Sequence, residues 1–218
     1  MLPVVVWCLF ALIALANWAA VVRGDRRTEA VVKPAALLAL TTAALAGGAA
    51  DAHAGWWLVV ALLLGTLGDA LLLGDSDERF LAGLAAFLVG HAAYLVCFAM
   101  LGLHASGWLG AGVLAAAAAL VASRTVLPRV LREQGAVVAL PVAAYSLVIC
   151  AMLVAAWSTE HLLVGLGAAV FVASDTVLAL DRFDRPARWV APYPHLVVMV
   201  TYHLGQALVV LGVLHALG

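Results

Sequence analysis

Long apolar runs are the feature that most constrains the fold of this chain. Between polar breaks, eight runs approach or exceed the roughly 20 apolar residues that a helix needs to cross a bilayer. Because a backbone in lipid must satisfy its own hydrogen bonds, each run is expected to be helical. The expected helices are 3–22, 34–49, 55–73, 81–102, 108–123, 136–157, 162–180 and 193–216.

Composition indicates the same class of protein. Of the 218 residues, 67% are hydrophobic and 11% are charged, and the mean hydropathy is +1.13. A soluble domain could not hide that much apolar surface. Strands of a transmembrane barrel would alternate apolar and polar residues, which these runs do not. We therefore predict an all-α integral membrane protein, with 1–218 as a single transmembrane domain of eight helices. Nothing in the sequence indicates a nucleic-acid or protein partner.

Positive charge is distributed in a pattern that predicts topology. The chain has eleven Lys and Arg residues, and all of them fall in alternate expected loops. These loops follow the first (Arg23, Arg26, Arg27, Lys33), third (Arg79), fifth (Arg124, Arg129, Arg132) and seventh (Arg182, Arg185, Arg188) helices. Basic loops stay in the cytoplasm. Both termini are therefore expected on the outer side of the cell's inner (plasma) membrane.

A faint internal repeat divides the chain into 1–106 and 107–218. The segment "GDALLLGD" at 68–75 matches "SDTVLALD" at 174–181, and "AVV" at 30–32 recurs at 136–138 with the same offset. An even number of helices per half would make two parallel four-helix repeats, related by an axis along the membrane normal. The repeat aligns Asp69 with Asp175.

Asp69 and Asp175 are the two acids that lie clearly within expected spans. Placing an ionisable side chain there costs at least about 2.5 kcal/mol, so such residues mark functional sites. Each stands six residues before a polar helix end, which predicts a shared depth in the cytoplasmic half of the bilayer. The alternative is that each carboxyl caps a neighbouring helix or binds a buried hydroxyl.

Other polar side chains could join these acids in a candidate site. The supporting candidates are His91 and Tyr94 in the fourth expected helix, Tyr202, His203 and Gln206 in the eighth, Thr66 in the third, and Asp75 and Lys33 at cytoplasmic helix ends. Interhelical hydrogen bonding would explain Tyr94, Gln206 and Thr66 without function, and Lys33 could simply extend its ammonium to the interface. Two Asp and two His could bind zinc, but no HExxH, HxxxH or CxxC spacing occurs, and we expect neither a metal nor another cofactor.

Several segments carry a family resemblance. "GDALLL", "FLAGLAAFLVGHAAYLVCF", "ASDTVLALDRF" and "TYHLGQALVVLG" resemble the YhhN-like family of membrane proteins, the lysoplasmalogenases. The resemblance covers Gly68 to Phe98 and Phe171 to Gly212 well, and the first two helices thinly through "KPAALL". It implies hydrolysis of the vinyl ether bond of lysoplasmalogens to a fatty aldehyde and glycerophosphoethanolamine or glycerophosphocholine. The implied partners are therefore a lysophospholipid substrate and membrane lipid.

Vinyl ether hydrolysis suits a pair of acids. Protonation of the β-carbon gives an oxocarbenium ion that water attacks, and two carboxyl groups serve a related reaction in glycosidases. Two acids in one apolar pocket cannot both ionise cheaply, so one is expected to keep its proton. Asp69 and Asp175 are the predicted catalytic pair, and the residues leave open which of them is the acid. A proton-coupled small-molecule or lipid transporter, and a CREST-like metal-dependent lipid amide or ester hydrolase, are the alternatives.

Overall fold

The computed structural model describes residues 2–74, 76–183 and 193–218, and within them the chain is helical with no strand. The helices are α1 (Leu2–Arg23), α2 (Arg26–Ala46), α3 (His53–Leu72), α4 (Asp77–Leu101), α5 (Trp108–Val121), α6 (Leu127–Gln134), α7 (Ala136–Ser158), α8 (Leu162–Phe183) and α9 (Pro194–Leu217). A π-helical turn at Ala122–Val126 joins α5 to α6. Eight stretches of the described chain are long and apolar enough to span a membrane, with α5 and α6 contributing one between them. The predicted eight-span, all-α fold is confirmed.

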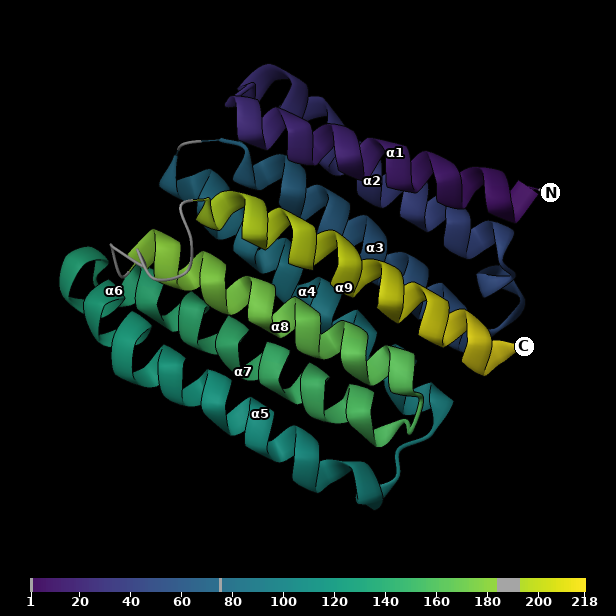
Figure 1. Ribbon diagram of the computed structural model, residues 1–218. Helices are drawn as coiled ribbons and strands as arrows, with labels where there is room; N and C mark the ends of the chain where they lie inside the picture. The colour runs from purple at the N-terminus through teal and green to yellow at the C-terminus, as the bar shows by residue number, and fades with distance from the viewer. Residues whose placement is uncertain (1, 75, 184–192) are drawn as a thin grey trace.

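The spans form one bundle in which neighbours in sequence often pack together. The most extensive contacts join α3 to α4, α8 to α9, and α1 to α2. α9 also contacts α1, α2 and α3, while α7 contacts α4, α5 and α8. Both termini lie at one end of the bundle, and α6 lies at the other (Figure 1). α9 therefore links the first three helices to α8.

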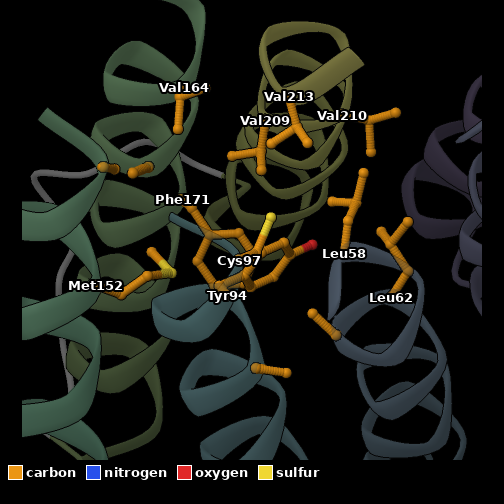
Figure 2. Packing of buried hydrophobic residues seen from close by; sticks show 14 of the residues in the cluster. Leu58, Leu62, Tyr94, Cys97, Met152, Val164, Phe171, Val209, Val210 and Val213 are labelled. Atoms are coloured by element: carbon orange, nitrogen blue, oxygen red, sulfur yellow. The ribbon is translucent and has the colours of Figure 1, made fainter. Parts of the chain in front are cut away.

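An apolar core fills the space between α3, α4, α7, α8 and α9. Figure 2 shows the rings of Tyr94 and Phe171 among the side chains of Met152, Cys97 and Val209. These residues are nearly inaccessible to solvent, whereas many outward-facing Leu and Val side chains are exposed, as a lipid-facing surface requires. Contacts that are individually small accumulate in such a core and hold the helices in register.

The second helix begins eight residues earlier than expected. The apolar pattern predicts a start at Pro34, with Lys33 in a basic loop, but α2 begins at Arg26 and contains both residues. Asp25 caps the helix, since its carboxylate accepts hydrogen bonds from the backbone amide and the hydroxyl of Thr28. A capping side chain satisfies backbone groups that the first turn leaves free. The cap therefore starts the helix among the charged residues that suggested a loop. The connection between α1 and α2 is only residues 24–25.

The fifth span also continues past its expected end. The predicted helix stopped at 123, whereas the helical path runs through the π turn and α6 to Gln134. Arg, Glu and Gln are good helix formers, so a change from apolar to polar residues marks where a span leaves lipid and need not end the helix. The basic residues that define the topology thus lie largely in helical turns rather than in loops.

Glycines allow α8 and α9 to pack with their backbones in contact. A Cβ on Gly167 would lie 2.7 Å from the Val209 amide nitrogen, and a Cβ on Gly205 would lie 2.9 Å from that of Phe171. Small residues at a membrane helix interface permit such close approach. Because α8 carries Asp175 and α9 carries Tyr202, this contact sets the spacing between two elements of the candidate site.

Gly205→Ala should destabilise the bundle, because the added methyl group meets backbone that cannot move without separating α8 from α9. We expect a loss of about 1–3 kcal/mol in the free energy of unfolding. The matched control is Gly112→Ala, where the new methyl group meets nothing within 4 Å and helix propensity improves by up to about 1 kcal/mol. Thermal unfolding in detergent measures both. Equal melting temperatures for the two variants would contradict the close contact.

Candidate active site

A cavity of about 740 Å³ lies between the helices and contains both predicted catalytic acids in its lining. Its polar wall includes Lys33, Asp69, Tyr145, Asp175 and Tyr202. Its apolar wall includes Leu72, Leu84, Phe87, Ile149 and Val172, and its rim at the basic end of the bundle includes Arg26, Gln134, Asp181, Arg182 and His195. The cavity therefore extends from the membrane-embedded acids to the helix ends that carry the positive charge.

Asp69 is held by two other helices. Lys33 on α2 forms an ion pair with it, with 3.4 Å between Nζ and Oδ1. The hydroxyl of Tyr202 on α9 donates a hydrogen bond of 2.9 Å to Oδ2. Asp69 is only 1% exposed and Lys33 is 7% exposed. A buried ion can remain charged only if a partner and hydrogen bonds replace its lost hydration, and here both carboxylate oxygens have a partner.

Asp175 has a different environment. The hydroxyl of Tyr145 on α7 donates a hydrogen bond to its Oδ2, and no ion pair joins it to any residue of the described ranges. Asp175 is also partly exposed, unlike Asp69. Its neighbour Ser174 donates to the Val198 carbonyl at 2.9 Å, which ties α8 to α9 at this level. The two carboxyl groups thus share a cavity, but only Asp69 has an ion-pair partner among the described residues.

The sequence around Asp69 explains how its helix is positioned. A Cβ on Gly68 would lie 2.6 Å from the ring of Phe87, so this glycine lets the Phe87 ring on α4 pack directly against α3. Phe87 also makes an edge-on contact with the ring of Tyr202, with centroids 6.4 Å apart. Because Phe87 lines the cavity as well, one aromatic ring fixes the position of Asp69, of its tyrosine partner and of the cavity wall.

The structure places Tyr94, Gln206 and His91 near the acids but outside the cavity lining. Tyr94 on α4 donates a hydrogen bond to Oε1 of Gln206 on α9, which is the interhelical role named as the alternative for both. His91 contacts the Phe87 carbonyl through Nδ1 at 2.6 Å, and its Nε2 has no hydrogen-bond partner. Its ring packs edge-on against Tyr145, with centroids 5.3 Å apart. His91 thus reaches Asp175 only through Tyr145.

His203 and Thr66 form hydrogen bonds away from the two acids. His203 accepts a hydrogen bond of 3.0 Å from the Trp18 indole of α1. Thr66 donates to the Leu62 carbonyl in its own helix. Asp75 lies outside the described residues. Met199 and Tyr202 of α9 both line the cavity.

The equal spacing of the two acids from their helix ends is not observed. α3 ends at Leu72, three residues after Asp69, whereas α8 continues to Phe183, eight residues after Asp175. Helix ends read from the first polar residue were wrong because α8 continues through a charged turn. The acids nevertheless line one cavity.

Tyr145 is the functional candidate that the sequence interpretation missed. It is one of only four tyrosines in the chain and lies within an otherwise apolar span. A tyrosine hydroxyl inside a membrane needs a hydrogen-bond partner. That requirement was the available signal, but it does not identify which helix supplies the partner.

No group of three or more His, Cys, Asp or Glu side chains with the spacing of a metal site occurs in the described ranges. The acidic residues at the level of Asp69 and Asp175 are accompanied by tyrosines and a lysine instead. Carboxyl groups with hydroxyl and ammonium neighbours can transfer protons and stabilise charge, which is general acid–base chemistry.

Fold and site together define a polytopic helical membrane protein with two acids in the lining of one cavity. Residues 28–213 match the YhhN family, and the chain belongs to it. It is 35% identical over 158 residues to lysoplasmalogenase TMEM86B of Homo sapiens, covering 72% of this chain and 62% of that protein. It is 35% identical over 165 residues to TMEM86B of Rattus norvegicus (75% and 64%) and 29% identical over 161 residues to TMEM86A of Bos taurus (71% and 64%).

The chain thus spans less than two thirds of the length of the curated relatives that it matches. No solved structure matches the chain. Membership of the family agrees with the resemblance that the sequence motifs indicated.

Lys33→Met should destabilise the protein because it leaves the Asp69 carboxylate buried without its cation. Removal of one partner from a buried ion pair costs about 3 kcal/mol or more. The double variant Lys33→Met/Asp69→Asn should regain most of that loss, since neither charge is then buried. Unfolding free energies in detergent measure the coupling. The ion pair contributes nothing if the two losses in the free energy of unfolding are additive. In that case Asp69→Asn would lower the stability of Lys33→Met by as much as it lowers the stability of the wild-type protein.

Proposed function

We propose that the protein is a membrane lipid hydrolase that cleaves the vinyl ether bond of lysoplasmalogens. The observation that carries the proposal is the shared cavity of Asp69 and Asp175. Support comes from the relatives, which are named lysoplasmalogenases. The products are a fatty aldehyde and glycerophosphoethanolamine or glycerophosphocholine, and no cofactor takes part.

The shape and lining of the cavity fit a lipid with one chain. Apolar side chains such as Leu84, Phe87 and Ile149 provide surface for the fatty chain, while the polar wall holds the acids. In this substrate the reacting bond joins the apolar chain to the polar glycerol. With the fatty chain against the apolar wall, this bond would lie next to the carboxyl groups of the polar wall. Apolar pockets with a few convergent polar groups are the usual form of a small-molecule site.

The two carboxyl groups have different roles in this proposal. Asp69, with its lysine and tyrosine partners, is the ionised carboxylate. Asp175, with a tyrosine partner and no ion pair among the described residues, keeps its proton and is the acid. Paired carboxyl groups whose environments favour opposite protonation states divide acid and base work in this way. Tyr145 occupies one oxygen of Asp175, so the proton resides on the other.

The first step transfers the proton of Asp175 to the β-carbon of the vinyl ether. The carbon–carbon double bond supplies the electron pair, and the positive charge appears on the oxocarbenium group. The new Asp175 carboxylate stabilises that charge. The water oxygen then bonds to the α-carbon while Asp69 accepts a proton from that water, which gives a neutral hemiacetal.

The second step regenerates both residues. Asp69 returns its proton to the glycerol oxygen as the carbon–oxygen bond breaks. Asp175 accepts the hemiacetal hydroxyl proton as the carbonyl forms. The net reaction consumes one water and releases an aldehyde and an alcohol, and each carboxyl group ends in its starting state.

Asp175→Asn and Asp69→Asn should each lower kcat for aldehyde release at least about 100-fold, the size of a general acid or base contribution. Asp51→Asn is the matched control, because Asp51 is an exposed acid on the short helix Ala49–Asp51 and does not line the cavity. Aldehyde release from purified protein in detergent is measured. Each variant is checked for folding by its elution and melting temperature. Full turnover in either cavity variant removes that residue from the mechanism.

Reaction in D₂O tests the protonation step separately. Carbon protonation places one deuterium on the carbon next to the aldehyde group, which mass spectrometry detects. Product aldehyde incubated in D₂O with the protein controls for later exchange. An aldehyde without that deuterium would contradict protonation by a solvent-equilibrated acid.

The alternatives predict different outcomes in the same preparation. A proton-coupled transporter acts only across a sealed membrane, so it would release no aldehyde in detergent. A CREST-like hydrolase would contain bound metal and lose activity on chelation. Metal analysis of the purified protein, with and without a chelator, distinguishes it from the metal-independent acid pair.

We also propose that the protein resides in the inner (plasma) membrane with both termini outside. The described basic residues lie at the bundle end opposite the termini (Figure 1), and basic ends stay in the cytoplasm. Alkaline phosphatase, which is active only outside the cytoplasm, should be active when fused after Gly218 and inactive when fused after Gly135. The reverse pattern would invert the topology.

A further inference from the structure

Two arginines stand at the rim of the cavity that holds the acids. Arg26 on α2 and Arg182 on α8 both line it, and both are exposed. We propose that Arg26 and Arg182 bind the phosphate group of the lipid substrate's headgroup. This inference rests on the proposed function, because the substrate of that function is a lysophospholipid.

Helical register places both arginines at a matching distance from the reacting groups. Arg26 precedes Lys33 by seven residues on α2, and Arg182 follows Asp175 by seven on α8. Seven residues make about two turns and about 10.5 Å of axial rise. Residues seven apart also share a helix face. Each arginine therefore lies two turns from a polar residue of the cavity wall, on the same face of its helix, toward the basic end of the bundle.

The substrate has the length to fit this spacing. Five bonds of about 1.5 Å separate the ether oxygen from the phosphorus across the glycerol. Because the bonds zigzag at tetrahedral angles, the extended end-to-end distance is roughly 6 Å. A charge-assisted hydrogen bond from guanidinium to phosphate adds about 3 Å. These two lengths together are close to the axial rise of about 10.5 Å between Asp175 and Arg182. A vinyl ether at Asp175 thus puts the phosphate within reach of Arg182.

The surroundings of Arg182 prepare it for such a contact. Its guanidinium lies over the ring of Phe80, 3.9 Å from the centroid. Stacking on an aromatic face fixes the guanidinium plane while its N–H groups point outward along that plane. A planar fork of donors matches two phosphate oxygens.

Acidic groups also occur at this rim and limit its net charge. Asp181 lines the cavity, and Asp77 is close enough to Arg182 to interact electrostatically. Glu29 is already engaged, since its Oε1 lies 2.7 Å from Nε2 of His195. The rim therefore combines two guanidinium groups with carboxylates. That combination fits a zwitterionic headgroup, whose phosphate contacts the arginines and whose amine faces the acids.

The test compares a lysoplasmalogen with the corresponding 1-alkenylglycerol, which lacks the phosphate. Arg26→Gln and Arg182→Gln should each raise KM for the lysoplasmalogen about tenfold, the loss expected for one charge-assisted hydrogen bond, with kcat nearly unchanged. Neither variant should alter the kinetics on the alkenylglycerol. The matched control is Arg27→Gln, since Arg27 neighbours Arg26 in α2 and is exposed but does not line the cavity.

Unchanged KM in both variants, or an equal change on the phosphate-free substrate, overturns the inference. Failure of the proposed function looks different, because the wild-type protein would then release no aldehyde from either substrate. In that case calorimetric binding of a non-hydrolysable 1-alkyl lysophospholipid tests the site directly. Wild type should bind it about tenfold more tightly than Arg182→Gln, a difference that should vanish with 1-alkylglycerol. Equal binding by both proteins overturns the inference independently of turnover. Inorganic phosphate is tested as a competitor of the 1-alkyl lysophospholipid. If phosphate binds as tightly as the lipid does, the site binds a free anion and the inference is overturned.

Discussion

The rest of the site depends on how one buried carboxylate is kept compatible with a membrane interior. An isolated ion there is costly, and the Lys33–Asp69 pair with the Tyr202 hydrogen bond offsets that cost. These three residues come from α2, α3 and α9, so the compensation of one charge fixes three helices relative to one another. A buried ion pair adds little stability compared with apolar packing. Its presence is better explained by a requirement for charge at that position.

Asp175, the second carboxyl group, is held by hydrogen bonds and helix packing rather than by an ion pair. Tyr145 and Ser174 connect α8 to α7 and α9 by hydrogen bonds, and the glycine contact between α8 and α9 sets their separation. Both acids line the cavity, but Asp175 is partly exposed whereas Asp69 is nearly inaccessible. In the proposed mechanism, this asymmetry between an ion-paired carboxylate and a hydroxyl-bonded one lets two like residues perform opposite proton transfers.

Part of the candidate site could be predicted because its signal is local. An acid in an apolar run is unusual by itself, so Asp69 and Asp175 were identified without knowledge of any neighbour. Lys33 and Tyr202 were identified as polar groups in the right region, but not as partners of Asp69. Tyr145 was missed, and His203 and Thr66 proved to bond elsewhere, to Trp18 and to the Leu62 carbonyl. A polar residue in an apolar span indicates that a hydrogen-bond partner is needed, but it does not indicate which helix supplies that partner.

The sequence by itself determined the membrane class, the eight spans and the separation of helix ends with Lys and Arg from helix ends without them, because hydrophobicity and charge act on each segment alone. It located helix ends less well, since helix propensity and capping carried α2 and the fifth span beyond their apolar parts. Only the tertiary structure decided which polar groups meet. Tyr202 and Asp69 are 133 residues apart in the chain. Such pairs depend on how separate helices pack, and packing depends on many side-chain contacts at once rather than on any one segment.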